Sequence, residues 1–196
     1  MRQSVLARSA PPRRLGRGGL ALAAGALFVA GLAIPRPVHP EAAAPSQCEA
    51  APSPDDVLRR LNEARLRGAL CHQSGDVAVA APLEWSARLA AVAAAQAQDM
   101  AQLNHMGHRD SQNRGLTERL AAMGYRFSAA AENIAVGYPS LDAVVDAWLD
   151  SEAHCDNLMS AKVRELGLAC SDSRAAGDPG EFRYWTLVLG APPRAR

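Results

Sequence analysis

Apolar residues recur with a helical period in several stretches after residue 52. The first stretch opens with Ser53, a good N-cap, and with Pro54, which suits the first helical position. This helix is predicted to close at Gly68. A second helix is predicted over residues 87–104, with Ser86 as its cap, because apolar residues lie on one broad face there.

Later in the chain, shorter helical stretches give way to the pattern of strands. Short helices are predicted over 116–123, from the cap Ser140 to about residue 150, and over 151–159. The segments 165–170 and 183–190 are strand-like, and the turn-rich connection between them predicts an antiparallel pair. Helices first and strands last, with little strand–helix alternation, predict an α+β fold.

The first 44 residues differ from the rest of the chain. Five arginines precede an uncharged run of 16 residues, 19–34, which is shorter than the ~20 apolar residues that a bilayer-spanning helix needs. This pattern is typical of a secretory signal, and residues 42–44 offer a small-residue cleavage site. We expect residues 1–44 to be a signal peptide, with an uncleaved membrane anchor as the alternative, and residues 45–54 to be a linker.

Removal of this leader changes the charge of the chain. It takes away six Arg and one Glu, which turns the formal charge of +1 into −4. The rest of the sequence shows no basic patch, so we expect no nucleic-acid partner. We expect a periplasmic or secreted monomer that contacts a membrane only where the leader is retained.

Four cysteines follow the leader, and an even count in an exported chain favours disulfides. Three pairings are open. We prefer Cys48–Cys71 with Cys155–Cys170, because each bridge then closes a short loop between neighbouring elements. With all four cysteines in bridges, no thiolate is left for cysteine-protease chemistry.

Three side chains able to bind a metal or move a proton stand in polar surroundings: His108, Glu132 and His154. They are too far apart in sequence to share one helix face, so the fold has to bring them together. Two imidazoles and one carboxylate form a ligand set that zinc or a similar divalent ion accepts. Without a metal, Glu132 can orient a histidine that acts as a base.

A structural role is the alternative for these residues. The two histidines would then satisfy backbone groups at helix starts, and Glu132 would cap a turn. His105 is a rival for the role of His108, or a cap of the preceding helix. Arg119 is expected to form an ordinary salt bridge. The sequence lacks the GxSxG, HExxH, GxxxxGK[ST] and GxGxxG motifs.

Several ordered motifs resemble bacterial domains of the CAP superfamily (SCP-like), named for cysteine-rich secretory proteins, antigen 5 and pathogenesis-related-1. They are LNEAR (61–65), HRDSQNRGLTERLAAMGY (108–125), AENIAVGY (131–138), W-x-x-S-x-x-H-x-x-N-L (148–158) and YWTLVLG (184–190). The resemblance covers residues 55–191 and leaves 192–196 as a tail. It implies an α-β-α sandwich, in which a small antiparallel sheet lies between helical layers, with one strand more than the pattern above predicts.

The resemblance also implies a cleft lined by two His and two Glu, proposed in that family to bind a divalent metal. By motif, His108, Glu132 and His154 match three of the four. Many members carry the second Glu three residues after the Trp, where this chain has Ser151, with Glu152 adjacent. Adjacent helical side chains point ~100° apart, so the fourth ligand is not carried over.

Members of the superfamily are linked to sterol or fatty-acid binding, to modulation of other proteins and to proteolysis. We therefore expect a binding module rather than an enzyme, with an ion in its cleft and a small lipid or a protein partner on its surface. A metal-assisted hydrolase with Glu132 as base is one alternative, although no nucleophile or oxyanion donor is evident. A disulfide-stapled envelope protein whose cleft binds nothing is the other.

Overall fold

Five strands of the described chain form one mixed sheet in the order β1-β3-β5-β4-β2. The structure is a computed structural model that describes residues 3–7, 48, 51–71, 79–173 and 182–194. The strands are β1 (Gln3–Ala7), β2 (Glu84–Trp85), β3 (Ala129–Val136), β4 (Glu165–Asp172) and β5 (Arg183–Ala191). β3, β5 and β4 pair antiparallel, whereas β1 joins β3 and β2 joins β4 in parallel. The centre of the sheet is antiparallel, as predicted, and its edges make it mixed.

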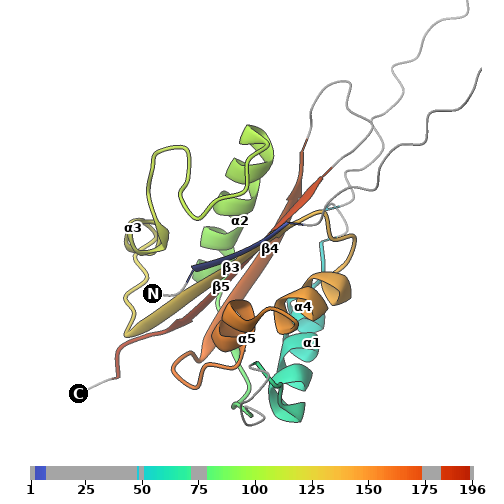
Figure 1. The fold of residues 1–196 in the computed structure, drawn as a ribbon. Helices are drawn as coiled ribbons and strands as arrows, with labels where there is room; N and C mark the ends of the chain where they lie inside the picture. Colours follow the sequence, from blue (N-terminus) through green and yellow to red (C-terminus); the bar gives the residue numbers. More distant parts are fainter. Residues whose placement is uncertain (1–2, 8–47, 49–50, 72–78, 174–181, 195–196) are drawn as a thin grey trace, which may run out of the picture. The chain divides into compact units, whose positions relative to one another are not determined.

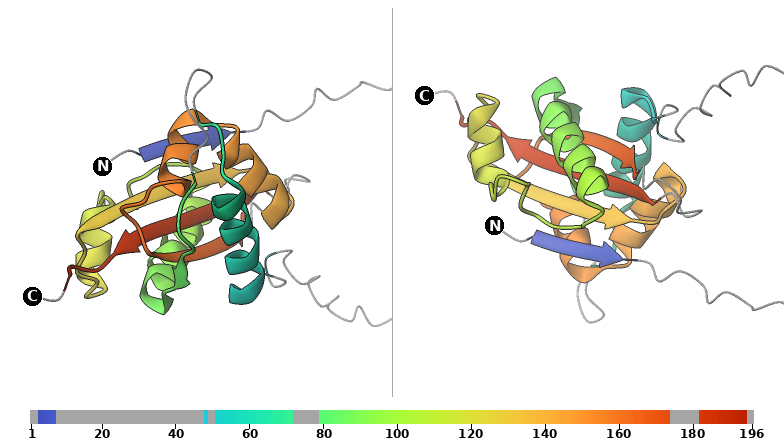
Figure 2. Two further views of the ribbon diagram at one scale, coloured as in Figure 1. Left: turned by 90° about the horizontal axis from the view of Figure 1, so that it is seen from below. Right: turned by 90° about the horizontal axis from the view of Figure 1, so that it is seen from above.

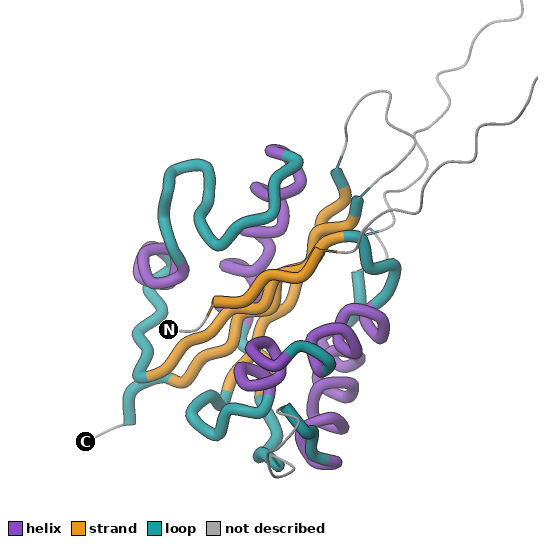
Figure 3. Tube along the Cα trace, viewed as in Figure 1, coloured by secondary structure: helices purple, strands orange, loops and turns teal. Residues whose placement is uncertain are grey.

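Helices cover both faces of this sheet (Figure 1). One face carries α2 (Ala87–Leu103) and α3 (Leu116–Ala122). The other carries α1 (Pro54–Arg67), α4 (Leu141–Leu149) and α5 (Glu152–Leu158), as the turned views of Figure 2 and the tube in Figure 3 also show. The predicted α+β class and the α-β-α sandwich are confirmed.

Side chains of β5 alternate between the two helical layers. Leu187 packs in a core cluster with Trp148 of α4, whereas Val188 packs in another with Leu89 and Leu120 of α2 and α3. Successive side chains of a strand point to opposite faces, so one central strand supplies apolar surface to both layers. The sheet is thereby held on both sides, and polar residues of its strands lie deep in the protein.

Helix boundaries follow the predicted signals. The hydroxyl oxygens of Ser53 and Ser140 each accept a backbone N–H three residues further on, both at 3.2 Å. Gly68 ends α1 with a φ of 81°, which glycine adopts without the steric cost that other residues meet. Ser86 precedes α2 as expected, but its side chain makes no capping bond.

β3 is the strand that the hydrophobic pattern does not reveal and that the resemblance implies. Five consecutive residues, 131–135, are buried, because strands flank β3 on both sides and helical layers cover both faces. A strand buried on both faces lacks the alternation of apolar and polar residues that marks a half-exposed strand. Glu132 and Asn133 stand in its middle, where neither is exposed to solvent.

The preferred cysteine pairing, Cys48–Cys71 with Cys155–Cys170, is wrong. The bridges are Cys48–Cys170 and Cys71–Cys155, with Cα–Cα distances of 6.1 and 5.3 Å. The preference for short loops fails because the fold places β4 beside the segment before α1, and α5 beside the segment after α1. The bridges span 122 and 84 residues of sequence, so both join elements that lie far apart along the chain.

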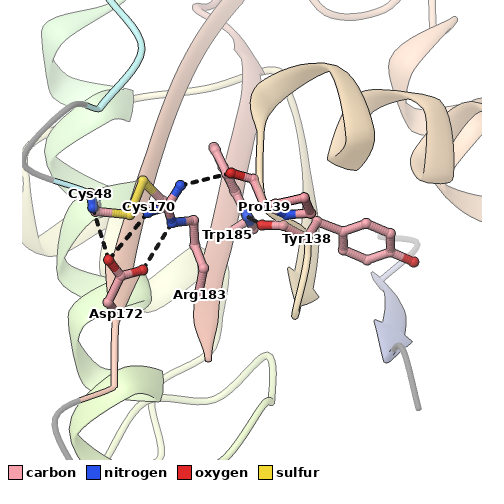
Figure 4. The surroundings of a disulfide bond; sticks show 7 residues. All are labelled: Cys48, Tyr138, Pro139, Cys170, Asp172, Arg183 and Trp185. Atoms are coloured by element: carbon pink, nitrogen blue, oxygen red, sulfur yellow. Dashed lines mark hydrogen bonds and ion pairs between the residues drawn. A yellow bond between two sulfur atoms is a disulfide. The ribbon is translucent and has the colours of Figure 1, made fainter. Parts of the chain in front are cut away.

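The Cys48–Cys170 bridge lies beside an ion pair at the end of the sheet (Figure 4). Asp172 accepts the backbone N–H of Cys48 at 2.8 Å and two bonds from Arg183, at 2.9 and 3.3 Å. Arg183 also donates to the carbonyl of Pro139 at 2.9 Å. These bonds join the segment before α1, the β4–β5 pair and the loop before α4.

Most of the predicted signal peptide lies outside the described residues. Within it, Gln3–Ala7 forms β1 along the edge of β3. None of the helices in the described ranges has the length and apolar character needed to cross a bilayer. Cleavage of the leader and the extent of the 45–54 linker stay predictions.

Candidate functional site

Two of the three predicted site residues meet on the face of β3 that α2 and α3 cover. His108 stands in the loop after α2, and its Nδ1 lies 2.9 Å from Oε1 of Glu132. Glu132 is completely buried, and the side chain of His108 is 10% exposed. A histidine nitrogen this close to a carboxylate donates its N–H to it. When His108 is neutral, Nε2 is therefore its acceptor nitrogen.

Arg119 of α3 completes this group. Its Nη1 donates to Oε2 of Glu132 at 2.8 Å, and its Nη2 donates to Oε1 at 3.0 Å. Nη2 also donates to the backbone carbonyl of His108 at 3.2 Å. The bidentate pair neutralises the buried carboxylate and holds the loop of His108 against β3. We call His108, Arg119 and Glu132 the His108 group.

Sequence reasoning predicts a salt bridge for Arg119 but assigns it no place in the site. Arg119 is 4% exposed, so its salt bridge is buried. A signal was available: Leu116 and Leu120 mark the buried face of α3, and Arg119 stands three residues after Leu116 on that face. An arginine among the buried positions of a short helix needs buried acceptors for its N–H groups, and a buried acid is one such acceptor.

His108 and Arg119 each have one buried nitrogen without a partner among the described residues, and in His108 this nitrogen is Nε2. The atom is buried, yet it has no hydrogen-bond partner within the part of the chain that the structure describes. Leaving a buried polar atom unpaired costs about 1–3 kcal/mol. When His108 is neutral, Nε2 is therefore the acceptor of the His108 group that no described residue uses.

The third predicted residue, His154, stands in the opposite layer. Asn133, the neighbour of Glu132 on β3, donates its side-chain N–H to the backbone carbonyl of His154 at 3.1 Å. Asn157 in turn donates to Oδ1 of Asn133 at 2.9 Å. His154 belongs to α5, in the layer on the other face of the sheet from α2 and α3 (Figure 1).

The remaining candidates take the following places. Ser151, where many family members carry the second Glu, lies with its Oγ 2.8 Å from Nδ1 of His154. Glu152 is the first residue of α5 and is exposed. His105 is exposed, and its backbone N–H closes the end of α2 by donating to the carbonyl of Met100 at 3.1 Å.

The hydrogen bonds around Glu132 affect whether its carboxylate can bind the predicted metal ion. Both oxygens of Glu132 accept bonds from Arg119, and Oε1 accepts a further one from His108. A divalent ion at this carboxylate would have to displace one of these donors. Across the described ranges, no three His, Cys, Asp or Glu side chains gather closely enough to hold an ion. The arrangement favours an ion-pair role for Glu132, and an ion shared with His154 stays a prediction.

Two curated proteins are similar to part of this chain. Two proteins of Bacillus subtilis strain 168 are similar: the uncharacterised membrane protein YlbC, 35% identical over 88 residues, and the uncharacterised protein YkwD, 29% identical over 92 residues. The matches cover 45% and 47% of this chain but only 25% and 36% of those proteins. The match thus spans a quarter of YlbC and little more than a third of YkwD.

The fold also matches a solved structure. A crystal structure of an extracellular protein from Bacillus anthracis that contains an SCP domain aligns with a TM-score of 0.52 and 24% identity. The alignment covers 69% of this chain and 39% of that one. The family model named CAP, the cysteine-rich secretory protein family, matches residues 58–189, a span that includes the whole His108 group. Because this span is more than half of the chain, the protein belongs to the cysteine-rich secretory protein (CAP) family.

Proposed function

We propose that this protein is an exported binding module that recognises a small ligand through the His108 group. The observation that carries the proposal is the buried Nε2 of His108, which lacks a hydrogen-bond partner among the described residues. Arg119 and Glu132 hold the imidazole in place from the other side. A bound donor at Nε2 would remove the cost of the unpaired atom and so contribute to affinity.

The charge of the group indicates the chemistry of its ligand. Arg119 and Glu132 cancel each other, so the group presents an acceptor nitrogen without a net charge beside it. A neutral molecule with one hydroxyl donor and an apolar body suits such a place. A small lipid with a hydroxyl group, such as a sterol, has this chemistry; a protein partner is the other outcome to test.

Two disulfides support a place outside the cytoplasm. Cys48–Cys170 and Cys71–Cys155 engage all four cysteines, and such bridges persist in oxidising compartments. Together with the predicted leader, they support a periplasmic or secreted protein.

A hydrolase is the second candidate, favoured by one observation. Glu132 orients His108 through Nδ1, as a carboxylate orients a general base in hydrolases. A base acts on a nucleophile within hydrogen-bond reach. No described hydroxyl lies within that reach of Nε2, and no cysteine is free. These facts favour binding over turnover.

Lipid titration of the purified full chain tests the binding proposal. A fluorescent sterol and a fluorescent fatty acid are the probes, read by fluorescence anisotropy. We expect saturable sterol binding that weakens at least tenfold in His108→Ala. His105→Ala, which removes an exposed imidazole three residues away, is the matched control and should bind as the unaltered chain does. Absence of sterol binding, or equal binding by His108→Ala, would count against the proposal.

Zinc titration by calorimetry tests the predicted ion separately. An ion shared by the two histidines requires both His108 and His154, so either substitution by Ala should abolish binding. The geometry leads us to expect that His154→Ala leaves any zinc affinity unchanged. Equal loss in both variants would establish the shared ion.

Peptide and ester libraries test the hydrolase. A turnover that disappears in Glu132→Gln, while sterol binding persists, would support the dyad as a catalytic base. A chain that hydrolyses none of these substrates leaves the binding module as the function.

A further inference from the structure

A pocket lies between α2, the loop of residues 110–114 and α3. It has a volume of about 370 Å³, and it is lined by residues that include Val92, Gln96, Asp99, Ser111, Arg119 and Met123. Pockets for small molecules have volumes of about 300–1,000 Å³, so this one can hold a compact ligand. His108 and Glu132 do not line it. We call it the α2–α3 pocket.

Two residues of the pocket carry buried polar atoms without a partner in the described chain: Oε1 of Gln96 and Nε of Arg119. The amide of Gln96 is oriented by its Nε2, which donates to the carbonyl of Gly107 at 2.7 Å. Turning the amide over would set two acceptors against each other, so Oε1 stays unpaired. Two residues that line the pocket thus carry one unused acceptor and one unused donor, each buried within its wall.

The guanidinium of Arg119 is equally constrained. Three of its five N–H groups donate to Glu132 and to the backbone carbonyl of His108, and Nε is its one nitrogen without a bond in the described chain. The positive charge is cancelled by Glu132. The free N–H therefore acts as an oriented donor and not as an unpaired charge.

The acids of the pocket have partners of their own. Asp99 accepts the backbone N–H and the hydroxyl of Ser111 at 2.7 and 2.6 Å. Asp110 pairs with Nε of Arg114 at 2.8 Å. An anionic ligand would meet these two carboxylates, and a cationic ligand would meet the two arginines. The pocket therefore favours a neutral ligand.

Apolar residues form the rest of the wall. Val92, Ala95, Ala122 and Met123 line the pocket beside its polar members. They offer contact to a methyl or methylene group but no hydrogen bond. A ligand that suits these residues has a donor, an acceptor and a small apolar substituent.

We propose that the α2–α3 pocket binds a neutral ligand through a secondary amide. The amide carbonyl accepts from Nε of Arg119, the amide N–H donates to Oε1 of Gln96, and the acyl methyl group packs on Val92 and Met123. The exposed side chains at the rim, among them Gln98 and Gln112, move aside to admit it. The site is independent of Nε2 of His108, so it goes beyond the proposed function.

An amide satisfies both buried atoms, whereas other common groups satisfy one. A carboxylate has no donor for Gln96, and an amine has no acceptor for Arg119. A hydroxyl is both a donor and an acceptor, but it carries no acyl methyl group to pack on the apolar wall of the pocket. N-acetyl sugars and acetylated amino-acid amides share the required chemistry.

Ligand-detected saturation-transfer NMR and calorimetry on the full chain test the site. The amide probes are N-acetylglucosamine and N-acetylalanine methylamide, which distinguish a sugar from a peptide source. Glucose and acetate are controls that lack the amide. We expect at least one amide probe to bind with millimolar or tighter affinity, and glucose and acetate to bind at least tenfold more weakly.

Two variants test whether the amide probes bind in the α2–α3 pocket. Ala122→Phe fills the pocket from an exposed position of α3 and should weaken amide binding at least tenfold, and Gln96→Met should do the same by removing the acceptor. Ala121→Phe, an exposed neighbour that does not line the pocket, is the matched control and should bind normally.

Three results would overturn the proposal. They are absence of binding by both amide probes, binding that Ala122→Phe leaves unchanged, and binding of glucose or acetate as tight as that of the amides. Gln96→Met alters a buried residue, so a loss of binding in that variant could reflect a loss of folding. Ala122→Phe alters an exposed residue and should fold normally, which circular dichroism can verify.

Discussion

Glu132 and Asn133 are neighbours on β3, are equally buried, and point to opposite faces of the sheet. On the face of Glu132, the guanidinium of Arg119 from α3 and the imidazole of His108 from the loop after α2 meet the carboxylate. On the face of Asn133, an uncharged amide connects β3 to the backbone and a side chain of α5. One strand thus supplies an ionic group to one layer and a neutral amide bridge to the other.

The two faces differ in whether their buried polar atoms all have hydrogen-bond partners. Both the carbonyl and the N–H of the Asn133 amide have partners within the protein. The Glu132 side uses its charges to orient His108 and Arg119, and each of these keeps one buried nitrogen unpaired among the described residues. The comparison teaches that buried polar residues of one strand can have all their bonds made on one face and hold partners with unused buried atoms on the other.

Removal of Arg119 should have the largest effect. Arg119→Met leaves the buried carboxylate of Glu132 without its counter-charge, and we expect a loss of about 3–5 kcal/mol in the free energy of unfolding. Urea unfolding at neutral pH measures it. The double variant Arg119→Met/Glu132→Gln removes both charges and should recover part of the loss. A loss below about 1 kcal/mol, as for an exposed ion pair, would contradict the buried pair.

Asn133 should matter for stability alone. Asn133→Ala leaves the carbonyl of His154 and the amide of Asn157 without this bridge, and we expect a loss of about 2–3 kcal/mol in the free energy of unfolding. Sterol affinity, measured on the folded fraction, should stay within twofold of that of the unaltered chain. A tenfold change in affinity would show that the two faces are coupled.

His108 should show the reverse. His108→Ala loses the bond to Glu132 but also removes the unpaired Nε2, so we expect a loss of only about 1 kcal/mol in the free energy of unfolding. The same variant should lose sterol binding, as set out above. Thermal unfolding of His108→Ala beside His105→Ala measures the difference, and a destabilisation as large as that of Asn133→Ala would assign His108 to structure.

Low pH should remove the small contribution that Asp110, in the loop beside α3, makes to the free energy of unfolding. Burial raises the pKa of Asp110, but hydrogen bonds from Arg114 and Gln112 outweigh it and hold this pKa below its usual value of 3.8. A carboxyl with a lowered folded-state pKa contributes stability above its unfolded pKa and loses it as pH falls further. We expect the loss to appear below pH 3.8. Asp110→Asn should lack this part of the acid dependence in unfolding curves between pH 5 and 3.

Helices were the part of the fold most accessible to prediction. Capping serines, a terminal glycine and the helical period act within about four residues, so the sequence around each helix contains its boundaries. β4 and β5 were also found from pattern, at Glu165–Asp172 and Arg183–Ala191. β3 was not, because burial on both faces removes its alternation, and the family resemblance supplied it.

The candidate site was only partly predictable. His108 and Glu132 were singled out by residue type and by motif, and the structure places them in contact. For Arg119 the sequence predicts a salt bridge but not its partner, because an arginine can pair with any nearby acid. His154 was grouped with the other two, yet its described contacts are with Ser151 and Asn133.

Local sequence is therefore sufficient for the helix boundaries, the α+β class and the family of this protein. The assembled fold is needed for the cysteine bridges, for the pairing of Arg119 with Glu132 and for the position of His154. The physical reason is distance along the chain. Caps and helical periods join residues a few positions apart, whereas Arg119 and Glu132 are 13 residues apart and Cys48 and Cys170 are 122 apart. Which of many chemically suitable partners meet at such separations depends on how the layers pack around the sheet.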